Sequence, residues 1–185
     1  MTRTPTPPMH TETLEAAFPL FLRFGYRKTS MDELARAAGI SRQGLYLRFP
    51  NKKALFIAMV DHLCEKVEQQ IEPAFGASPP DLVAAFDAYV GAFVASGASY
   101  ATADEMVEAA ASFRGGRLQA LDSNFQSQLV DALQPYANPG LSAQDLAAIL
   151  SAASHGFKHS SESRQAYRES MALAVALAHR TAEKG

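Results

Sequence analysis

The sequence has only one cysteine, Cys64, among its 185 residues. A single thiol cannot form a disulfide within the chain, and this pattern fits the reducing cytoplasm. The sequence also lacks any run of about eighteen apolar residues, so no segment is predicted to span a membrane. Its opening residues, MTRTPTPPMHTE, lack the apolar stretch of a secretory signal. We therefore expect a cytoplasmic protein that has no membrane partner.

Signatures of catalysis are also missing. The sequence contains no P-loop, no HExxH motif, no nucleophile elbow and no dinucleotide-binding fingerprint. His155 and His159 are four residues apart and could in principle bind a metal with Glu162, but no cysteine or second acidic partner accompanies them. We therefore expect surface or capping histidines here, and no metal, no cofactor and no enzymatic activity. An enzyme built on a helical bundle is an alternative.

The net charge of −2 conceals an unequal distribution of charge along the chain. Residues 1–53 contain nine Lys or Arg and four Asp or Glu, which gives this segment a charge of +5. Residues 54–185 contain eight and fifteen, which gives −7. Attraction to phosphates is local, because salt screens charges beyond roughly 8–10 Å. The N-terminal segment is therefore suited to nucleic acid although the whole chain is slightly acidic.

Residues 29–53 predict two short helices joined by a tight turn. Ser30 and Glu33 have the spacing of a capping box, which begins a helix. Gly39 can adopt the positive φ that ends this helix, and Ser41 can cap a second helix over about 42–49. The second helix carries arginine, glutamine and tyrosine side chains. Two capped helices with this spacing are typical of a helix-turn-helix DNA-binding motif.

The rest of the chain has helical periodicity, and no useful length of it alternates with the period of a strand. We predict an all-α fold whose further helices span about 11–24, 52–72, 81–96, 103–113, 116–134, 142–159 and 163–180. Gly25 should end the first of these helices, and Pro19 should kink it or delay its start. Pro73 should end the long helix that follows the motif.

The segments FGY at 24–26, TSMDELARAAGIS at 29–41 and LYLRFPNKKALF at 45–56 follow one another with a specific spacing. Together they resemble the TetR family of one-component bacterial transcription regulators. The resemblance covers about a quarter of the chain. It implies a three-helix DNA-binding domain over 10–53 and a helical effector-binding and dimerisation domain over 54–185. Periodicity predicts about nine helices in all, and the three prolines of residues 1–9 predict a flexible arm there.

The resemblance implies a set of residues that contact double-stranded DNA. The predicted set is Thr29, Ser30, Ser41, Arg42, Gln43, Gly44, Tyr46, Leu47, Arg48 and Lys52. Hydroxyls at a helix N-terminus and the Lys52 ammonium suit phosphates. Arg42 can take both acceptors of guanine, and Gln43 can read adenine or a phosphate. Tyr46 is expected to donate to a phosphate, although a buried tyrosine would give the same pattern. Leu45 and Phe49 should pack the core.

The second helix of the motif departs from many relatives. Arg42 and Gln43 stand where Lys-Gly is common, Leu47 where an aromatic residue is common, and Arg48 where histidine or tyrosine is common. We therefore expect a shared fold but a different operator sequence, with more guanine contact by Arg42.

The resemblance also implies a small-molecule pocket in the C-terminal helices. The predicted pocket residues are Phe86, Tyr89, Phe93, Tyr100, Met106, Phe113 and Phe125. The alternative for each of them is a place in the core, where such aromatic stripes are more often found. Few charges accompany them, which favours an apolar or aromatic effector. We expect a repressor that its effector releases from DNA. A DNA-binding protein that responds to no ligand is the alternative.

One short helix reads a half-site too weakly alone, so a twofold homodimer on a palindromic operator is expected. The resemblance implies that the last two helices form the interface. The predicted interface residues are Leu146, Ile149, Leu150, Ala153, Met171, Val175 and Ala178. The core of a single chain would show the same apolar stripes.

Overall fold

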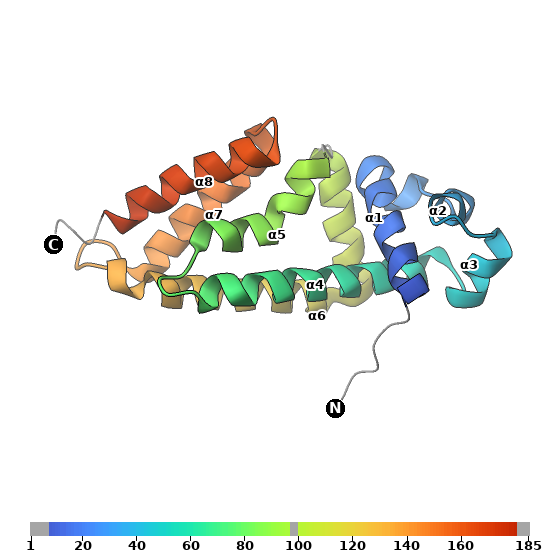
Figure 1. Cartoon of the computed structure of the whole chain (residues 1–185), viewed down its shortest axis with the longest axis horizontal. Helices are drawn as coiled ribbons and strands as arrows, with labels where there is room; N and C mark the ends of the chain where they lie inside the picture. Colours follow the sequence, from blue (N-terminus) through green and yellow to red (C-terminus); the bar gives the residue numbers. More distant parts are fainter. Residues whose placement is uncertain (1–7, 97–99, 181–185) are drawn as a thin grey trace, which may run out of the picture. The chain divides into compact units, whose positions relative to one another are not determined.

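The computed structural model of this chain describes residues 8–96 and 100–180 (Figure 1). The side chains of residues 8, 9, 92, 93, 95, 96, 100, 101, 103, 114 and 115 lie outside the described part, as does most of the arm predicted over 1–9. The elements are α1 (Pro8–Lys28), α2 (Met31–Ala37), α3 (Arg42–Arg48), α4 (Lys52–Gly76), α5 (Leu82–Ser96), α6 (Tyr100–Leu133), the 3-10 helix η1 (Gln134–Tyr136), α7 (Ala143–Ser160) and α8 (Arg164–His179).

The predicted all-α fold is confirmed. Over residues 8–96 and 100–180, the regular structure consists of eight α-helices and one 3-10 helix, beside an isolated bridge between Asn138 and Leu141. Ser142 caps α7 through a capping box with Asp145, because its hydroxyl accepts the Asp145 N–H at 3.1 Å. No described helix combines the length and the apolar character needed to cross a membrane.

Pro19 and Pro73 lie inside α1 and α4, although the sequence predicted an interruption at each of them. α4 continues past Pro73. In α1, the residue with non-helical dihedral angles is Gly25 rather than Pro19. A proline removes one N–H donor from its helix and crowds the preceding turn. Ile71 and Ala74 beside Pro73 are buried, and the burial of such side chains opposes that cost. The prediction that Pro73 ends the helix was therefore wrong.

The sequence predicted two helices where the structure has the single helix α6. The expected break lay at 114–115, directly before Gly116, and a glycine inside a helix costs about 1 kcal/mol relative to alanine. Met106 on one side of it and Leu121 on the other are both buried. Tertiary packing thus holds α6 helical across a sequence of low helix propensity.

The chain divides into two compact units. Unit 1 contains the described residues of 1–65 and 98–118, and unit 2 contains those of 66–97 and 119–185. α4 and α6 each contribute residues to both units. Unit 1 therefore includes more of the chain than the DNA-binding domain predicted over 10–53.

An aromatic cluster lies in the core of unit 1. Phe56 of α4 is fully buried and packs edge-on against Phe21 of α1, with ring centroids 5.1 Å apart. Phe113 of α6 packs in the same manner against Tyr26, at 5.1 Å, and against Phe56, at 6.1 Å. These contacts attach the first part of α6 to α1 and α4.

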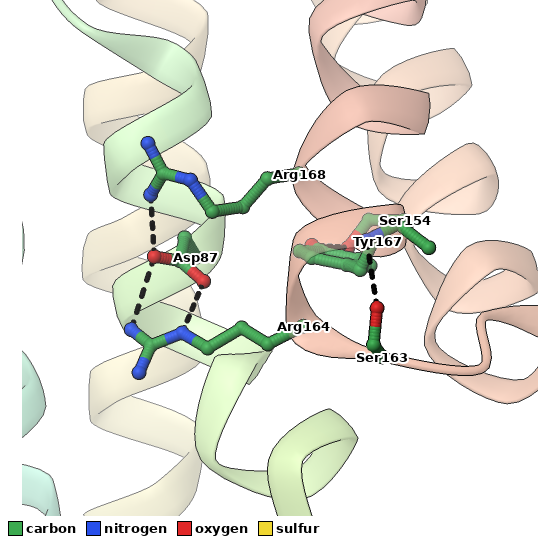
Figure 2. Close-up of polar contacts among 7 residues, drawn as sticks. Asp87, Ser154, Ser163, Arg164, Tyr167 and Arg168 are labelled. Atoms are coloured by element: carbon green, nitrogen blue, oxygen red, sulfur yellow. Dashed lines mark hydrogen bonds and ion pairs between the residues drawn. The ribbon is translucent and has the colours of Figure 1, made fainter.

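Polar contacts join α5, α7 and α8 in unit 2 (Figure 2). Asp87 of α5 accepts two hydrogen bonds from Arg164 and one from Arg168, both on α8. Burial favours the neutral carboxyl, but the hydrogen bonds and charges of the two arginines together lower the pKa of Asp87. The hydroxyls of Tyr167 and Ser154 are 2.8 Å apart, and burial raises the pKa of Tyr167 to about 12.

Candidate nucleic-acid interface

α2 and α3 begin at the caps that the sequence predicted. The hydroxyl of Ser30 accepts the N–H of Glu33 at 3.3 Å, and the carboxylate of Glu33 accepts the N–H of Ser30 at 2.8 Å. The hydroxyl of Ser41 accepts the N–H of Gly44 at 3.0 Å. Gly39, in the turn between the helices, has a φ of 66°. Local hydrogen bonds and one glycine therefore define both helices of the motif.

α3 has a buried side and an exposed side. Leu45 is 0% exposed and Phe49, just after the helix, is 3% exposed, which confirms their predicted place in the core. The exposed side carries Arg42, Gln43, Tyr46 and Leu47. Leu47 is 82% exposed. At about 100° per residue, positions 43 and 47 point most directly away from Leu45.

Two neighbours hold the guanidinium of Arg42. Its Nε lies 3.0 Å from Oδ1 of Asp32, and its Nη1 donates to Oδ2 at 3.2 Å. Its Cζ lies 5.6 Å from the centroid of the Tyr46 ring, which is within the range of a cation–π interaction. The Arg42 side chain is still 64% exposed. The group is thus oriented and remains open to a ligand.

Gly44 and Arg48 have local partners. A Cβ at Gly44 would lie 3.1 Å from Oγ of Ser41, so a glycine leaves room for the cap of α3. Nη1 of Arg48 donates to Oγ1 of Thr13 on α1 at 3.1 Å, in a half-buried position. Contacts of Gly44 and Arg48 with DNA remain predictions.

The structure corrects the predicted role of the Thr29 hydroxyl. Thr29 is 1% exposed, and its Oγ1 donates to the carbonyl of Gly25 at 2.7 Å. That carbonyl needs a donor because Gly25 leaves the helical conformation. The hydroxyl is therefore enclosed in the protein and cannot reach a phosphate. Ser30 is exposed, and its contact with a phosphate remains a prediction.

Lys52 has internal partners that the sequence did not reveal. Its Nζ donates to the carbonyls of Arg27, at 3.1 Å, and Thr29, at 2.8 Å, just where α1 ends. Burial lowers the pKa of Lys52, while the charge of nearby Glu105 opposes that shift. An ammonium group at this end of a helix satisfies carbonyls that have no partner within the helix. The predicted phosphate contact remains a prediction and would use the third N–H of the ammonium.

Glu105 of α6 is a residue of this region that sequence reasoning missed. Its Oε1 accepts the N–H of Arg27 at 2.8 Å, across 78 positions of sequence. Gly25 nearby has a φ of 79° and a ψ of 165°, and a Cβ there would lie 2.9 Å from Cδ of Glu105. Both the backbone conformation and the lack of space therefore require a glycine. The glycine of FGY was the one signal of this contact in the sequence.

The structure places the predicted pocket residues in different units. Phe86, Tyr89 and Phe125 form one cluster in unit 2, where the Phe125 ring lies 5.1 Å from Phe86 and 4.4 Å from Tyr89. Met106 and Phe113 belong to unit 1.

Phe113 is half-buried, and its ring packs against rings of α1 and α4 in unit 1, so its place in a pocket remains a prediction. Met106 is buried in that unit. The side chains of Phe93 and Tyr100 lie outside the described part of the chain.

The structure also corrects most of the predicted dimer interface. The residues buried within the single chain are Leu146, Leu150, Met171, Val175 and Ala178, each at most 7% exposed. They pack α7 and α8 into unit 2, so they cannot form an outer surface. Ile149 is 55% exposed and Ala153 is half-buried. The exposed large apolar residues of α8 are Leu173 (71%) and Leu177 (65%), neither of which was predicted for the interface.

Known protein sequences are similar to the part of the chain that contains the two capped helices. Residues 14–59 match the family described as bacterial regulatory proteins, tetR family. The HTH-type transcriptional regulator YhgD of Bacillus subtilis is 36% identical over 67 residues, which are 36% of this chain and 35% of that protein. RutR of Escherichia coli strain K12 is 36% identical over 52 residues, 28% of this chain and 24% of RutR. This chain thus spans about a third or less of the curated relatives it matches.

Solved structures match the whole fold. A TetR-like transcriptional regulator from Rhodococcus sp. RHA1 has a TM-score of 0.69 at 22% identity, and the match covers 99% of this chain and 100% of that chain. The fatty acid degradation regulator FadR from Bacillus halodurans has a TM-score of 0.63 at 13% identity, with 96% of each chain covered. At such low identity these matches establish a shared fold.

Proposed function

The chain belongs to the tetR family of bacterial regulatory proteins, and from this premise we propose that it is a DNA-binding transcriptional repressor. In this proposal it binds a palindromic operator as a homodimer, and a small apolar or aromatic effector releases it. The observation that carries the proposal is the outer side of α3, where Arg42, Gln43, Tyr46 and Leu47 are exposed on a helix capped at Ser41. The charge of +5 over residues 1–53 supports it.

The exposed side of α3 offers two kinds of base contact. Arg42 suits the two acceptors that guanine presents in the major groove. Leu47 has no polar group, so the contact available to it is the methyl group of thymine. A lone exposed leucine is common on protein surfaces. Leu47, however, points in the same outward direction as Gln43, on the helix that is proposed to contact the bases. We therefore expect a half-site that contains both guanine and thymine.

The proposed homodimer would use the outer sides of α7 and α8. Ile149, Leu173 and Leu177 are each more than half exposed on these packed helices. Small residues accompany them, and Ala148, Ala152, Ala172 and Ala176 are all exposed. Large apolar side chains set among alanines suit close packing of helices from a second copy. Leu173→Glu should yield monomers in sedimentation at micromolar concentration, whereas Gln165→Glu, with equal charge added on the same helix, should not.

The proposed effector would act on unit 2. Tyr89 stacks on Phe125, with the two rings inclined by 13°, and its hydroxyl donates to Asp122 at 2.8 Å. Phe125 and Asp122 belong to α6, the helix that also carries Glu105 in unit 1. A ligand that favours another conformation of α6 would therefore bias the contact at Gly25.

Selection of bound sites from random double-stranded DNA with the purified full-length chain tests the proposal. We expect enrichment of a palindromic site whose half-sites lie about one helical turn apart or more. Enrichment of no sequence would refute the DNA-reading role. A screen for compounds that both raise the melting temperature and weaken binding to the selected site tests the effector. A chain that binds its site but gives no such compound would support the ligand-independent alternative.

A further inference from the structure

Asp32 and Arg42 form an ion pair on the exposed surface of the two capped helices. Asp32 lies in the first turn of α2, and Arg42 is the first residue of α3. The carboxylate contacts both Nε and Nη1 of the guanidinium, at 3.0 and 3.2 Å. Because the two residues come from different helices, the pair ties the start of α3 to α2 across the turn.

Asp32 leaves most of the guanidinium donors available. An arginine has five N–H donors in a planar group, and Asp32 takes at most two of them. Guanine needs two, for O6 and N7. The Tyr46 ring, 5.6 Å from Cζ, further limits how the side chain can rotate. Arg42 can therefore bind guanine while its contacts with Asp32 and Tyr46 remain in place.

We propose that Asp32 is a positioning residue for base reading, which holds Arg42 in the orientation that recognises guanine. This inference rests on the proposed DNA-binding function and adds a specificity role for a residue outside α3. Fixing the side chain before binding removes part of the rotamer entropy that an arginine otherwise loses when it binds. For the guanine contact, the two donors must be aimed at O6 and N7, which guanine presents at one fixed place in the major groove.

A competing role for Asp32 predicts different measurements. If the carboxylate only competes with DNA for Arg42, its removal should strengthen binding and leave guanine selectivity equal or greater. If Asp32 positions Arg42, its removal should lower guanine selectivity. In either case an acidic group 52% exposed on this surface repels phosphates, so its removal should strengthen binding to unrelated DNA. Selectivity, rather than affinity, therefore separates the two roles.

The test uses full-length Asp32→Asn on the selected site and on the same site with its guanine pair replaced. We expect the ratio of the two affinities to fall about fivefold, within the range of a bidentate guanine contact. Asp32→Glu keeps the carboxylate and should restore most of that ratio. Glu12→Gln removes the same charge from an exposed position of α1 and should leave the ratio unchanged. Circular dichroism of each variant verifies that the helices are intact.

A double variant tests whether Asp32 acts through Arg42. In an Arg42→Ala background, Asp32→Asn should cause no further loss of guanine selectivity. An equal loss in both backgrounds, or an unchanged ratio in the single variant, would overturn the positioning role. A selected site without guanine would overturn it as well, while leaving DNA binding established. Failure of the wild-type chain to select any site would instead refute the proposed function itself.

Discussion

The exposed side of α3 and the turn at Gly25 belong to the same unit, yet they are fixed in opposite ways. α3 is capped by Ser41, and its Arg42 pairs with Asp32, only ten positions away. The turn at Gly25 is fixed by Glu105, whose partner Arg27 is 78 positions away. A surface fixed by local contacts can change its side chains while the fold persists. Residues of a turn that is fixed by a distant carboxylate cannot be changed without loss of that contact. We therefore expect the free energy of unfolding to depend on the turn at Gly25, and the selectivity for DNA sequence to depend on α3.

Gly25→Ala should cause the largest loss of stability. The new Cβ would meet the Glu105 carboxylate, with Cδ at 2.9 Å, in a backbone conformation that side chains disfavour. Strain and crowding together should lower the free energy of unfolding by about 3 kcal/mol in urea denaturation. Gly39→Ala is the matched control, because φ is 66° there but a Cβ at that position would have nothing within 4 Å. It should cost about 1–2 kcal/mol.

Gly25→Ala combined with Glu105→Ala should recover part of the loss, because the shorter side chain makes room for the new Cβ. The strain of the positive φ should persist. Equal losses for Gly25→Ala and Gly39→Ala would show that the contact with α6 contributes nothing to stability.

Local elements were predictable from the sequence because their causes are local. Ser30, Ser41 and Gly39 act within four residues of the helix ends they define, and the structure confirms all three. The exposed side of α3 follows from its periodicity once Leu45 is assigned to the core. Predictions of helix ends were wrong where packing between distant residues determines the end, as in α4, which continues through Pro73.

Candidate site residues divide in the same way. Apolar stripes on α7 and α8 could not distinguish a core from an interface, since both bury the same residue types. The structure assigns Met171 and Leu150 to the core and exposes Leu173. Thr29 shows the same limit, because its hydroxyl turns inward only when Gly25 leaves a carbonyl without a helical partner. Contacts such as that of Glu105 require the tertiary structure.

Arg42→Ala should have a large effect on DNA binding and a small one on stability. Loss of a bidentate guanine contact should weaken binding to the selected site by about 2 kcal/mol. The ion pair with Asp32 is exposed, so the free energy of unfolding should change by less than about 1 kcal/mol. Titration of the selected site and of a guanine-substituted site by fluorescence anisotropy measures the first effect. Equal weakening on both sites would assign Arg42 to a phosphate.

Glu105→Gln should affect stability less than Gly25→Ala does, since the amide keeps the shape and retains an acceptor for the N–H of Arg27. The loss of a charge-assisted hydrogen bond should cost about 1 kcal/mol in urea denaturation. Glu108→Gln, at an exposed position of α6 within one turn of it, is the control and should change little. A stability equal to that of the wild type would mean that the packing of α6, and not the carboxylate, fixes the turn.

Leu47→Ala should have the smallest effect of these variants, and it should change DNA binding but not stability. Because Leu47 is 82% exposed, its loss should leave the free energy of unfolding within about 0.5 kcal/mol of the wild type. If it covers a thymine methyl, replacing that thymine by deoxyuridine should weaken wild-type binding about fourfold, the value of one buried methyl group. The same replacement should leave binding by Leu47→Ala unchanged. Equal weakening for both proteins would mean that the methyl group acts through DNA shape, and α3 would then read this base pair without contacting it.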